Sequence, residues 1–267
     1  MRADAVVISD VGKVRGNNED NFFINGKFRK DVSSTYTLVK DCEKRSFGLY
    51  AVCDGMGGEE CGEFASLTAV RELKHFFNKD FLADADKYID KANKCVCDES
   101  AKKGGRMGTT LAVLYIEDDK AFGFNVGDSR MYLYREGTLK RISKDHTHAQ
   151  SLADMGLIGQ DEVDSHKGAH KLTQHLGILP DEMIIEPFKT GEIKVLRGDV
   201  FIICSDGITD MLTDDGICRI VGKNKDAESI AHELVDAALE NGGKDNATVM
   251  VIKPADEKGG FWSRIFG

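Results

Sequence analysis

Four aspartates stand where apolar runs begin or end: Asp20, Asp54, Asp206 and Asp245. Asp54 closes the run F-G-L-Y-A-V-C and Asp206 closes V-F-I-I-C-S, whereas the other two precede such runs. If the runs are neighbouring strands, their ends bring the carboxylates together. Clustered carboxylates raise one another's pKa unless a positive charge lies among them, and a hard divalent cation with oxygen ligands is the ordinary solution. The pattern predicts a metal-dependent hydrolase.

The glycines beside these aspartates favour the same interpretation. An isolated Asp-Gly pair usually marks a turn. Here Asp54 opens D-G-M-G-G and a helical pattern follows it, while Asp206-Gly207 repeats the arrangement at another strand end. Three glycines in four positions allow close backbone approach, so the carbonyl of Gly55 is a candidate ligand.

The motif R-G-N-N-E-D adds Arg15, Glu19 and Asp20. The two acids point in opposite directions in an extended chain, so both serve one centre only if one ligates directly and the other holds a coordinated water. The planar guanidinium of Arg15 suits a phosphate group. Taken alone, the motif also fits an acidic surface turn with an exposed arginine.

Two further segments carry polar residues. The motif N-V-G-D-S-R is either a hairpin turn or a place where Asp128 joins the same acidic rim. Histidines gather after it, and His166 is a candidate proton donor or substrate contact. The sequence has no P-loop, no G-x-S-x-G and no C-x-x-x-x-x-R, so it indicates neither nucleotide triphosphate binding by that route nor a nucleophilic serine or cysteine.

Short runs rich in Val, Ile, Phe and Tyr supply the elements that must position these residues. We expect strands over Ala5–Ser9, Asn21–Ile24, Gly48–Cys53, Thr110–Ile116, Lys120–Val126, Arg130–Arg135, Val200–Cys204 and Ala247–Lys253. Short turns between neighbours favour antiparallel pairing. Helical spacing recurs over 65–76, 89–96 and 230–238, and the first two stretches are consecutive, which is not β-α-β alternation. We therefore predict an α+β fold with antiparallel sheets covered by helix pairs.

The bulk composition narrows the class. The 267 residues, 41% of them hydrophobic, and the absence of a linker before about residue 254 predict a single domain over 1–253 with a C-terminal tail over 254–267. A net charge of −9 without a basic tract argues against nucleic-acid binding. No signal peptide or long apolar run is evident, so we expect a cytoplasmic protein with no membrane span. The seven cysteines are expected to be reduced thiols without structural zinc.

The ordered motifs resemble the bacterial branch of the metal-dependent protein phosphatases, the protein phosphatase 2C family. The resemblance runs from about residue 5 to 253 through R-G-N-N-E-D, V-C-D-G-M-G-G, G-T-T, N-V-G-D-S-R, D-H-T, L-T-Q-H-L-G, C-S-D-G-I-T-D and G-G-K-D-N-A-T-V. It implies a β-sandwich of two antiparallel sheets flanked by pairs of helices. It also implies a serine/threonine protein phosphatase with two, or with a third site three, Mn²⁺ or Mg²⁺ ions.

The resemblance assigns a role to each acidic position. Asp54 bridges two ions, Asp206 and Asp245 bind one, and Glu19 and the carbonyl of Gly55 bind the other. A water molecule on an ion is held by Asp20, and Asp128 with Asp206 matches a third-ion position.

For the reaction, the resemblance gives Arg15 the substrate phosphate, and residues 145–177 form a flap beside the cleft. A bridging hydroxide attacks phosphorus without a phosphoenzyme intermediate. Phosphorylated proteins are the expected substrates, a cognate serine/threonine kinase is an expected partner, and a monomer is expected.

Several positions depart from the family or have no assigned role. Met56 replaces the eukaryotic-branch histidine, and Glu59 and Glu60 follow where bacterial relatives often carry histidine, so the general acid is open. The sequence Thr173-Gln174-His175 replaces the more usual T-R-A. Segment 26–45 is expected to be a polar hairpin excursion, and the Phe261-Trp262 tail a loose end or a docking peptide. Two other functions stay open: a phosphohydrolase for small esters, and a binding module with a degenerate site.

Overall fold

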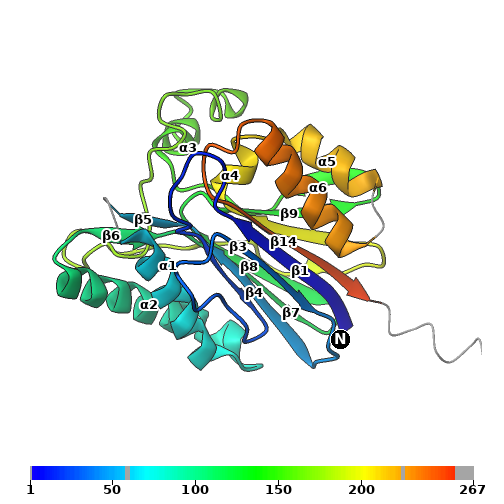
Figure 1. Cartoon of the computed structure of the whole chain (residues 1–267), viewed down its shortest axis with the longest axis horizontal. Helices are drawn as coiled ribbons and strands as arrows, with labels where there is room; N and C mark the ends of the chain where they lie inside the picture. The colour runs from blue at the N-terminus through cyan, green and yellow to red at the C-terminus, as the bar shows by residue number, and fades with distance from the viewer. Residues whose placement is uncertain (1, 58–60, 224–225, 256–267) are drawn as a thin grey trace, which may run out of the picture.

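The computed structural model describes residues 2–57, 61–223 and 226–255, and most of its strands form two antiparallel sheets packed face to face (Figure 1). The first sheet has the order β10-β9-β13-β14-β1-β3, formed by Thr138–Arg141, Arg130–Arg135, Val200–Cys204, Ala247–Ala255, Arg2–Asp10 and Tyr36–Asp41. The second has the order β11-β8-β7-β4-β2, formed by Phe188–Lys189, Lys120–Val126, Leu111–Glu117, Phe47–Cys53 and Asn21–Ile24, with β12 (Ile193–Lys194) also on β8. A small two-stranded sheet pairs β5 (Gly55–Gly57) with β6 (Met107–Thr109).

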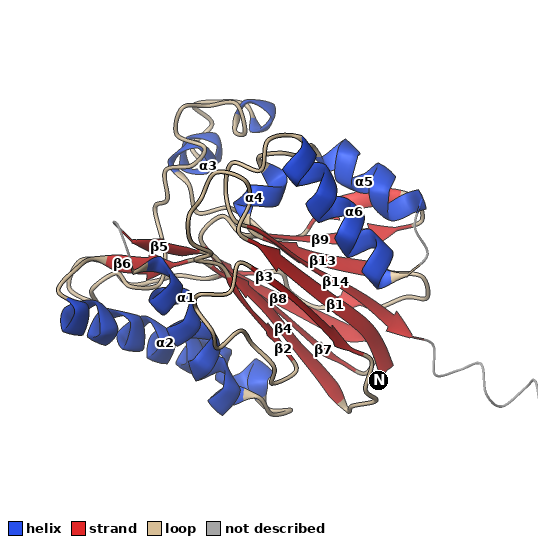
Figure 2. Ribbon diagram, viewed as in Figure 1, coloured by secondary structure: helices blue, strands red, loops and turns tan. Residues whose placement is uncertain are grey.

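Helices cover the outer face of each sheet, which gives four layers (Figure 2). The pair α1 and α2, Gly62–Leu73 and Phe81–Lys103, packs on the second sheet, and α5 and α6, Asp214–Lys223 and Ala227–Glu240, pack on the first. The shorter helices are η1 (Lys74–Phe76), α3 (His148–Asp154), η2 (Gln160–Glu162) and α4 (Asp206–Thr209). The expected α+β sandwich flanked by helix pairs is confirmed.

The apolar core follows the two-residue period of the strands. On β13, Phe201 and Ile203 pack between the two sheets, whereas Ile202 and Cys204 face the helices of the first sheet. Because both faces of such a strand are buried, its sequence is a continuous apolar run rather than an alternation. The central strands are therefore rigidly placed, and so are the residues at their ends.

Two expectations need correction. Segment 26–45 is not only an excursion, because residues 36–41 form β3 at the edge of the first sheet. Strand β14 continues through Ala255, two residues into the expected tail, and the Phe261-Trp262 part of that tail lies outside the described residues. The cysteines are free thiols, as expected. In the part of the chain that the structure describes, none of the helices has the length and apolar character needed to cross a membrane.

Candidate metal centre

The expected acidic residues converge at one end of the sandwich. Antiparallel pairing of β2 with β4 sets Asn21 opposite Cys53, so their neighbours Asp20 and Asp54 leave the second sheet side by side. In the first sheet, β13 ends at Cys204 and pairs with the start of β14, which brings Asp206 toward Asp245. Register between strands, rather than proximity in sequence, therefore builds the cluster.

The carboxyl groups of Asp54, Asp128 and Asp206 interact electrostatically. Burial, followed by the charges of Asp206 and Asp20, raises the pKa of Asp54 well above its ordinary value. Burial and the charge of Asp206 do the same to the pKa of Asp128. Burial, then Asp210 and Asp245, raises the pKa of Asp206 to about 6.

Asp20 is the most enclosed member of the cluster. Its side chain is 0% exposed, and Oδ2 accepts a hydrogen bond of 2.7 Å from the Ser205 hydroxyl. Burial is the main reason that its pKa rises to about 7, although the Ser205 hydrogen bond opposes the shift.

Two buried oxygen atoms in this cluster, Asp20 Oδ1 and Asp206 Oδ1, have no hydrogen-bond partner among the described residues. An unpaired buried carboxylate oxygen is costly, because burial removes it from water without a replacement. Hard divalent cations such as Mn²⁺ and Mg²⁺ take oxygen ligands of this kind. The orphaned oxygens, the repelling charges and the all-oxygen donor set fit such ions.

The loop that carries Glu19 is held by direct contacts from both sides. The Glu19 N–H donates to Asn246 Oδ1 at 2.7 Å, and its carbonyl accepts from the Ser66 hydroxyl at 2.6 Å. A Cβ added at Gly55 would lie 2.1 Å from the carbonyl oxygen of Gly62, and one at Gly62 would lie 2.6 Å from Glu19 Oε2. Glycine is therefore required where β5, helix α1 and the Glu19 carboxylate meet.

The G-T-T motif supports Asp54 from the other side. The Asp54 N–H donates to Thr110 Oγ1 at 2.8 Å, and its carbonyl accepts from Thr109 Oγ1 at 2.9 Å. Both threonines are buried. The side chains of this motif therefore fix the peptide of the central aspartate.

Arg15 lies beside the acidic cluster. Its Nη2 donates to Asp245 Oδ2 at 2.6 Å, and this hydrogen bond is the main cause of its raised pKa. The side chain is half-exposed and lines a cavity of about 830 Å³ together with Glu19 and Asn246. A guanidinium thus reaches the cluster from the solvent side, where an anionic ligand would enter.

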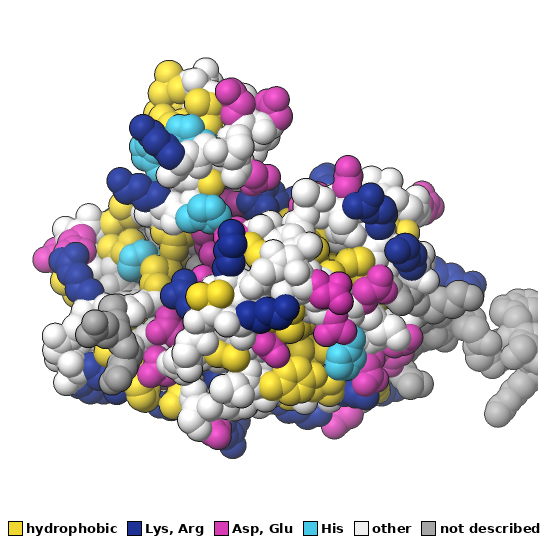
Figure 3. All heavy atoms as spheres, turned by 45° about the horizontal axis from the view of Figure 1, so that its top comes forward, with side chains coloured by type: hydrophobic (Ala, Val, Ile, Leu, Met, Phe, Trp, Pro, Cys, Tyr) yellow, Lys and Arg dark blue, Asp and Glu magenta, His cyan; other side chains and the backbone are white. Residues whose placement is uncertain are grey.

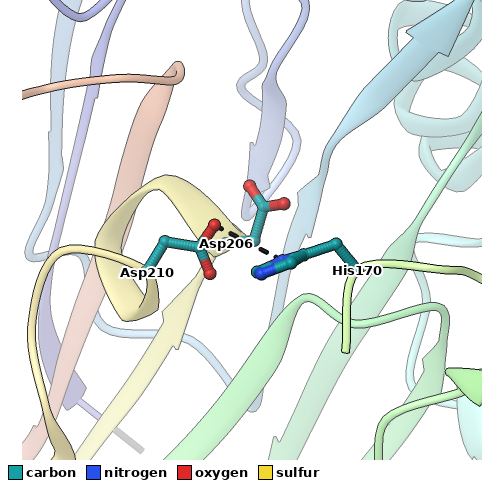
Figure 4. Close-up of side chains that lie close together, drawn as sticks. All are labelled: His170, Asp206 and Asp210. Atoms are coloured by element: carbon teal, nitrogen blue, oxygen red, sulfur yellow. Dashed lines mark ion pairs between the residues drawn. The ribbon is translucent and has the colours of Figure 1, made fainter. Parts of the chain in front are cut away.

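One group of three residues was not expected from the sequence. His170, Asp206 and Asp210 each place a ligand atom within 4.8 Å of the others, and they are the one such group among the described residues (Figure 4). His170 Nδ1 lies 3.5 Å from Asp210 Oδ2. Asp206 and Asp210 are four residues apart on one turn, which sequence spacing indicates, whereas the histidine comes from the flap.

These residues line a cavity of about 660 Å³, which also includes Asp128 and Asp245. His166, the candidate proton donor or substrate contact, is not among the residues that line it; its ring stacks on that of His148 with centroids 6.4 Å apart. Acidic side chains lie in the hollow below the projecting flap, with Lys and Arg near its rim (Figure 3).

The flap, residues 145–177, is fastened at its base. Arg130 donates to the buried carboxylate of Asp145 through Nε and Nη2 at 2.9 and 2.7 Å, and to Asp164 at 2.7 Å. An isolated bridge pairs Thr147 with Leu172 and so closes the two ends of the flap on each other.

The positions that depart from the family pattern do not line the acidic cavity of about 660 Å³ where the structure describes them. Met56 lies on β5 and lines a separate cavity of about 520 Å³ with Met107 and His175. Glu59 and Glu60 lie outside the described residues. Met56 has no proton to donate, so this position does not supply the general acid. Among the described histidines, His170 lines the acidic cavity of about 660 Å³.

Two family models and several known phosphatases match this chain. The model of "Protein phosphatase 2C" matches residues 5–152, and that of "Stage II sporulation protein E (SpoIIE)" matches residues 157–254. The serine/threonine protein phosphatase PstP of Mycobacterium tuberculosis is 32% identical over 254 residues, which cover 93% of this chain and 44% of that protein. This chain thus spans less than half the length of that relative. Serine/threonine phosphatase stp of Listeria welshimeri is 29% identical and covers 92% of this chain and 93% of its own.

Solved structures agree with the sequence relatives. The crystal structure of the Mycobacterium tuberculosis serine/threonine phosphatase PstP has a TM-score of 0.80 and 30% identity, covering 96% of this chain and 100% of that one. The PstP catalytic domain in complex with 2 manganese ions has a TM-score of 0.77 and 31% identity, covering 96% and 99%.

Proposed function

Because this chain belongs to the protein phosphatase 2C family, we propose that it hydrolyses phosphoserine and phosphothreonine in proteins with the help of divalent cations. The observation that carries the proposal is the set of buried, mutually repelling carboxylates at the ends of strands from both sheets, two of which have orphaned oxygens. A cluster of this kind has little reason to exist without bound cations.

The chain offers ligands for two ions and for a third. We assign these roles to Glu19, Asp54, the Gly55 carbonyl, Asp206 and Asp245 as direct ligands, Asp20 through a water molecule, and Asp128 with Asp206 for the third ion. Asp54 follows β4 of the second sheet, and its carboxyl interacts electrostatically with Asp206, which follows β13 of the first sheet; this supports Asp54 as the shared ligand. Manganese and magnesium both suit this donor set.

The chain's own residues account for the remaining requirements. When bound, the cations would lower the pKa of a water molecule and neutralise developing charge on the phosphoryl oxygens. Arg15, on the solvent side of the cluster, would hold the phosphate through its planar guanidinium. Burial raises the pKa of Cys53 far above its usual range and that of Cys204 to about 12, so neither thiol is a nucleophile. We propose direct attack by water, with no phosphoenzyme intermediate.

We place the protein in the cytoplasm as a monomer that acts on proteins phosphorylated by a cognate serine/threonine kinase. Some relatives align with this chain over almost their whole length, such as protein phosphatase PhpP of Streptococcus pneumoniae, which is 29% identical. Their names, as protein phosphatases, support the substrate class. Light scattering coupled to gel filtration tests the monomer.

The first test measures hydrolysis of an aryl phosphate and of phosphoserine, phosphothreonine and phosphotyrosine peptides with Mn²⁺, with Mg²⁺ and with a chelator. We expect activity only with the cations, and Asp54→Asn and Asp206→Asn should each lower kcat/KM by about 10³-fold, equivalent to about 4 kcal/mol. The exposed Asp119→Asn is the control and should behave as wild type.

Other outcomes identify the alternatives. Equal or better turnover of small phosphate esters than of phosphopeptides would indicate a small-molecule phosphohydrolase. No turnover at any cation concentration would indicate a binding module with a degenerate site. Wild-type rates in Asp206→Asn would contradict the metal-ligand assignment itself.

A further inference from the structure

The connection between β2 and β3 carries a buried arginine, Arg29, which is 4% exposed. An Asn-Gly turn puts it there: Asn25 and Gly26 both have positive φ, 49° and 92°, as a two-residue hairpin turn requires. The chain then returns beside β2. The Arg29 N–H donates to Asn21 Oδ1 at 3.2 Å, and Asn21 Nδ2 donates to the Arg29 carbonyl at 3.0 Å.

The guanidinium of Arg29 binds the backbone on both sides of Glu19. Its Nη2 donates to the carbonyl of Asn18 at 2.7 Å and also to the carbonyl of Asp20. Its Nη1 donates to the carbonyl of Ser34 at 2.9 Å. One side chain therefore joins the loop of two candidate metal ligands to the loop that precedes β3.

This arrangement is demanding because a buried cation needs all its partners. The described hydrogen bonds of the Arg29 guanidinium go to backbone carbonyls, and its buried Nε has no partner among the described residues. The carboxylate of Asp20 supplies the largest favourable charge interaction. Carbonyl geometry is fixed by the backbone, so the guanidinium is satisfied only while residues 18–20 keep their conformation.

We infer that Arg29 is a positioning residue that presets the Glu19–Asp20 loop for cation binding and links it to a wall of the substrate cavity. The inference rests on the proposed function. The wall is formed by Val32 and Ser33, which line the cavity of about 830 Å³ together with Arg15 and Glu19. Arg29 would therefore hold in place both the loop of the candidate metal ligands and the cavity wall beside which the substrate would enter.

The test compares Arg29→Met and Arg29→Lys with wild type by calorimetric titration of Mn²⁺ into the metal-free protein, without any substrate. Mutation of a residue that holds a metal ligand in place typically weakens metal affinity by about 10- to 100-fold. We expect the Mn²⁺ dissociation constant of Arg29→Met to rise by about 10-fold or more. Arg29→Lys keeps the charge but has fewer directed donors, so its affinity for Mn²⁺ should lie between those of wild type and Arg29→Met.

Arg135→Met is the matched control for lost stability. Arg135 donates to the buried carboxylate of Asp199 at 2.8 and 2.7 Å, next to the start of β13 and away from the end that carries Asp206. It should lower the thermal midpoint but leave Mn²⁺ affinity unchanged. If Arg29→Met lowers the midpoint equally and binds Mn²⁺ like wild type, Arg29 is only a structural residue and the inference is wrong.

Kinetics at saturating Mn²⁺ separate the wall from the metal loop. We expect Arg29→Met to raise KM for a phosphopeptide by more than it raises KM for an aryl phosphate, because a peptide is long enough to reach Val32 and Ser33 from the phosphate site and a small ester is not. Equal changes for both substrates would overturn the link to the wall. Failure of wild type itself to bind Mn²⁺ would instead contradict the proposed function, so the two failures are distinguishable.

Discussion

At the scale of single residues, the acidic cluster stores electrostatic repulsion that the fold must contain. Asp20 and Asp206 have folded-state pKa values raised to about 7 and about 6 from an ordinary 3.8, mainly by burial. A raised carboxyl pKa means that the folded state binds more protons than the unfolded state between these values. The ionised cluster is the unstable form until a cation joins it.

The free energy of unfolding of the metal-free protein should therefore fall as pH rises from about 4 to about 7. The stabilising contribution is complete below the unfolded-state pKa and is lost as the pH passes the folded-state values. Urea denaturation in chelator at about pH 5 and about pH 8 measures this slope. Asp20→Asn should flatten it, and an unchanged slope in that variant would contradict the assignment.

At the scale of elements, the flap contributes two unlike partners to Arg130. The side chain of Asp145 is 2% exposed and that of Asp164 is 69% exposed, although both accept from Arg130 at 2.7 Å. Desolvation makes the first pair structural, whereas solvent screens the second. The same cation thus fixes the base of the flap firmly and its far side weakly.

Asp145→Ala should lower the free energy of unfolding by about 3 kcal/mol, since it removes the buried partner. Asp164→Ala should cost less than about 1 kcal/mol. Chemical denaturation of both variants provides the comparison. Equal losses would show that burial does not distinguish the two ion pairs.

The elements also show what sequence can predict. A strand with two buried faces, such as β13, has the predicted bounds because a continuous apolar run allows little else. The edge strand β3 was missed because it is partly exposed and polar. Helix α5 was not predicted, since Gly216 and Gly222 weaken its helical signal.

The candidate site likewise contains residues that the sequence could locate and residues that it could not. Asp54 and Asp206 could be located from the sequence because each ends an apolar run, and their roles as metal ligands stay predictions. Arg29, His170 and Ser205 could not, because each gains its meaning from a partner far along the chain. Strand register and loop closure create those pairs, and neither is written in local spacing.

At the scale of the whole molecule, the acidic residues come from both sheets. Asp20 and Asp54 adjoin β2 and β4 of the second sheet, whereas Asp206 and Asp245 adjoin β13 and β14 of the first. Bound cations would therefore cross-link the two halves of the sandwich at one end. Ligand binding to the folded state alone stabilises it by about 2.7 kcal/mol at 100 times the dissociation constant.

Hydrogen exchange measures this cross-link directly. Mn²⁺ should slow exchange at the ends of both β4 and β13 that adjoin the cluster, and Asp54→Asn should remove the effect from both sheets. The remote Arg135→Met variant should retain it. Protection confined to one sheet would show that the ions do not join the two halves.

The closed base of the flap has an evolutionary consequence. Thr147 and Leu172 meet at its two ends, and the His146 carbonyl accepts from the Thr173 N–H at 2.8 Å, so the segment leaves and re-enters the body at nearly one point. Its interior can lengthen, shorten or be exchanged while the acidic cluster keeps its place. A lineage with this architecture can vary the surface beside the cavity by changing one segment, while the strands that adjoin Asp20, Asp54, Asp206 and Asp245 are inherited unaltered.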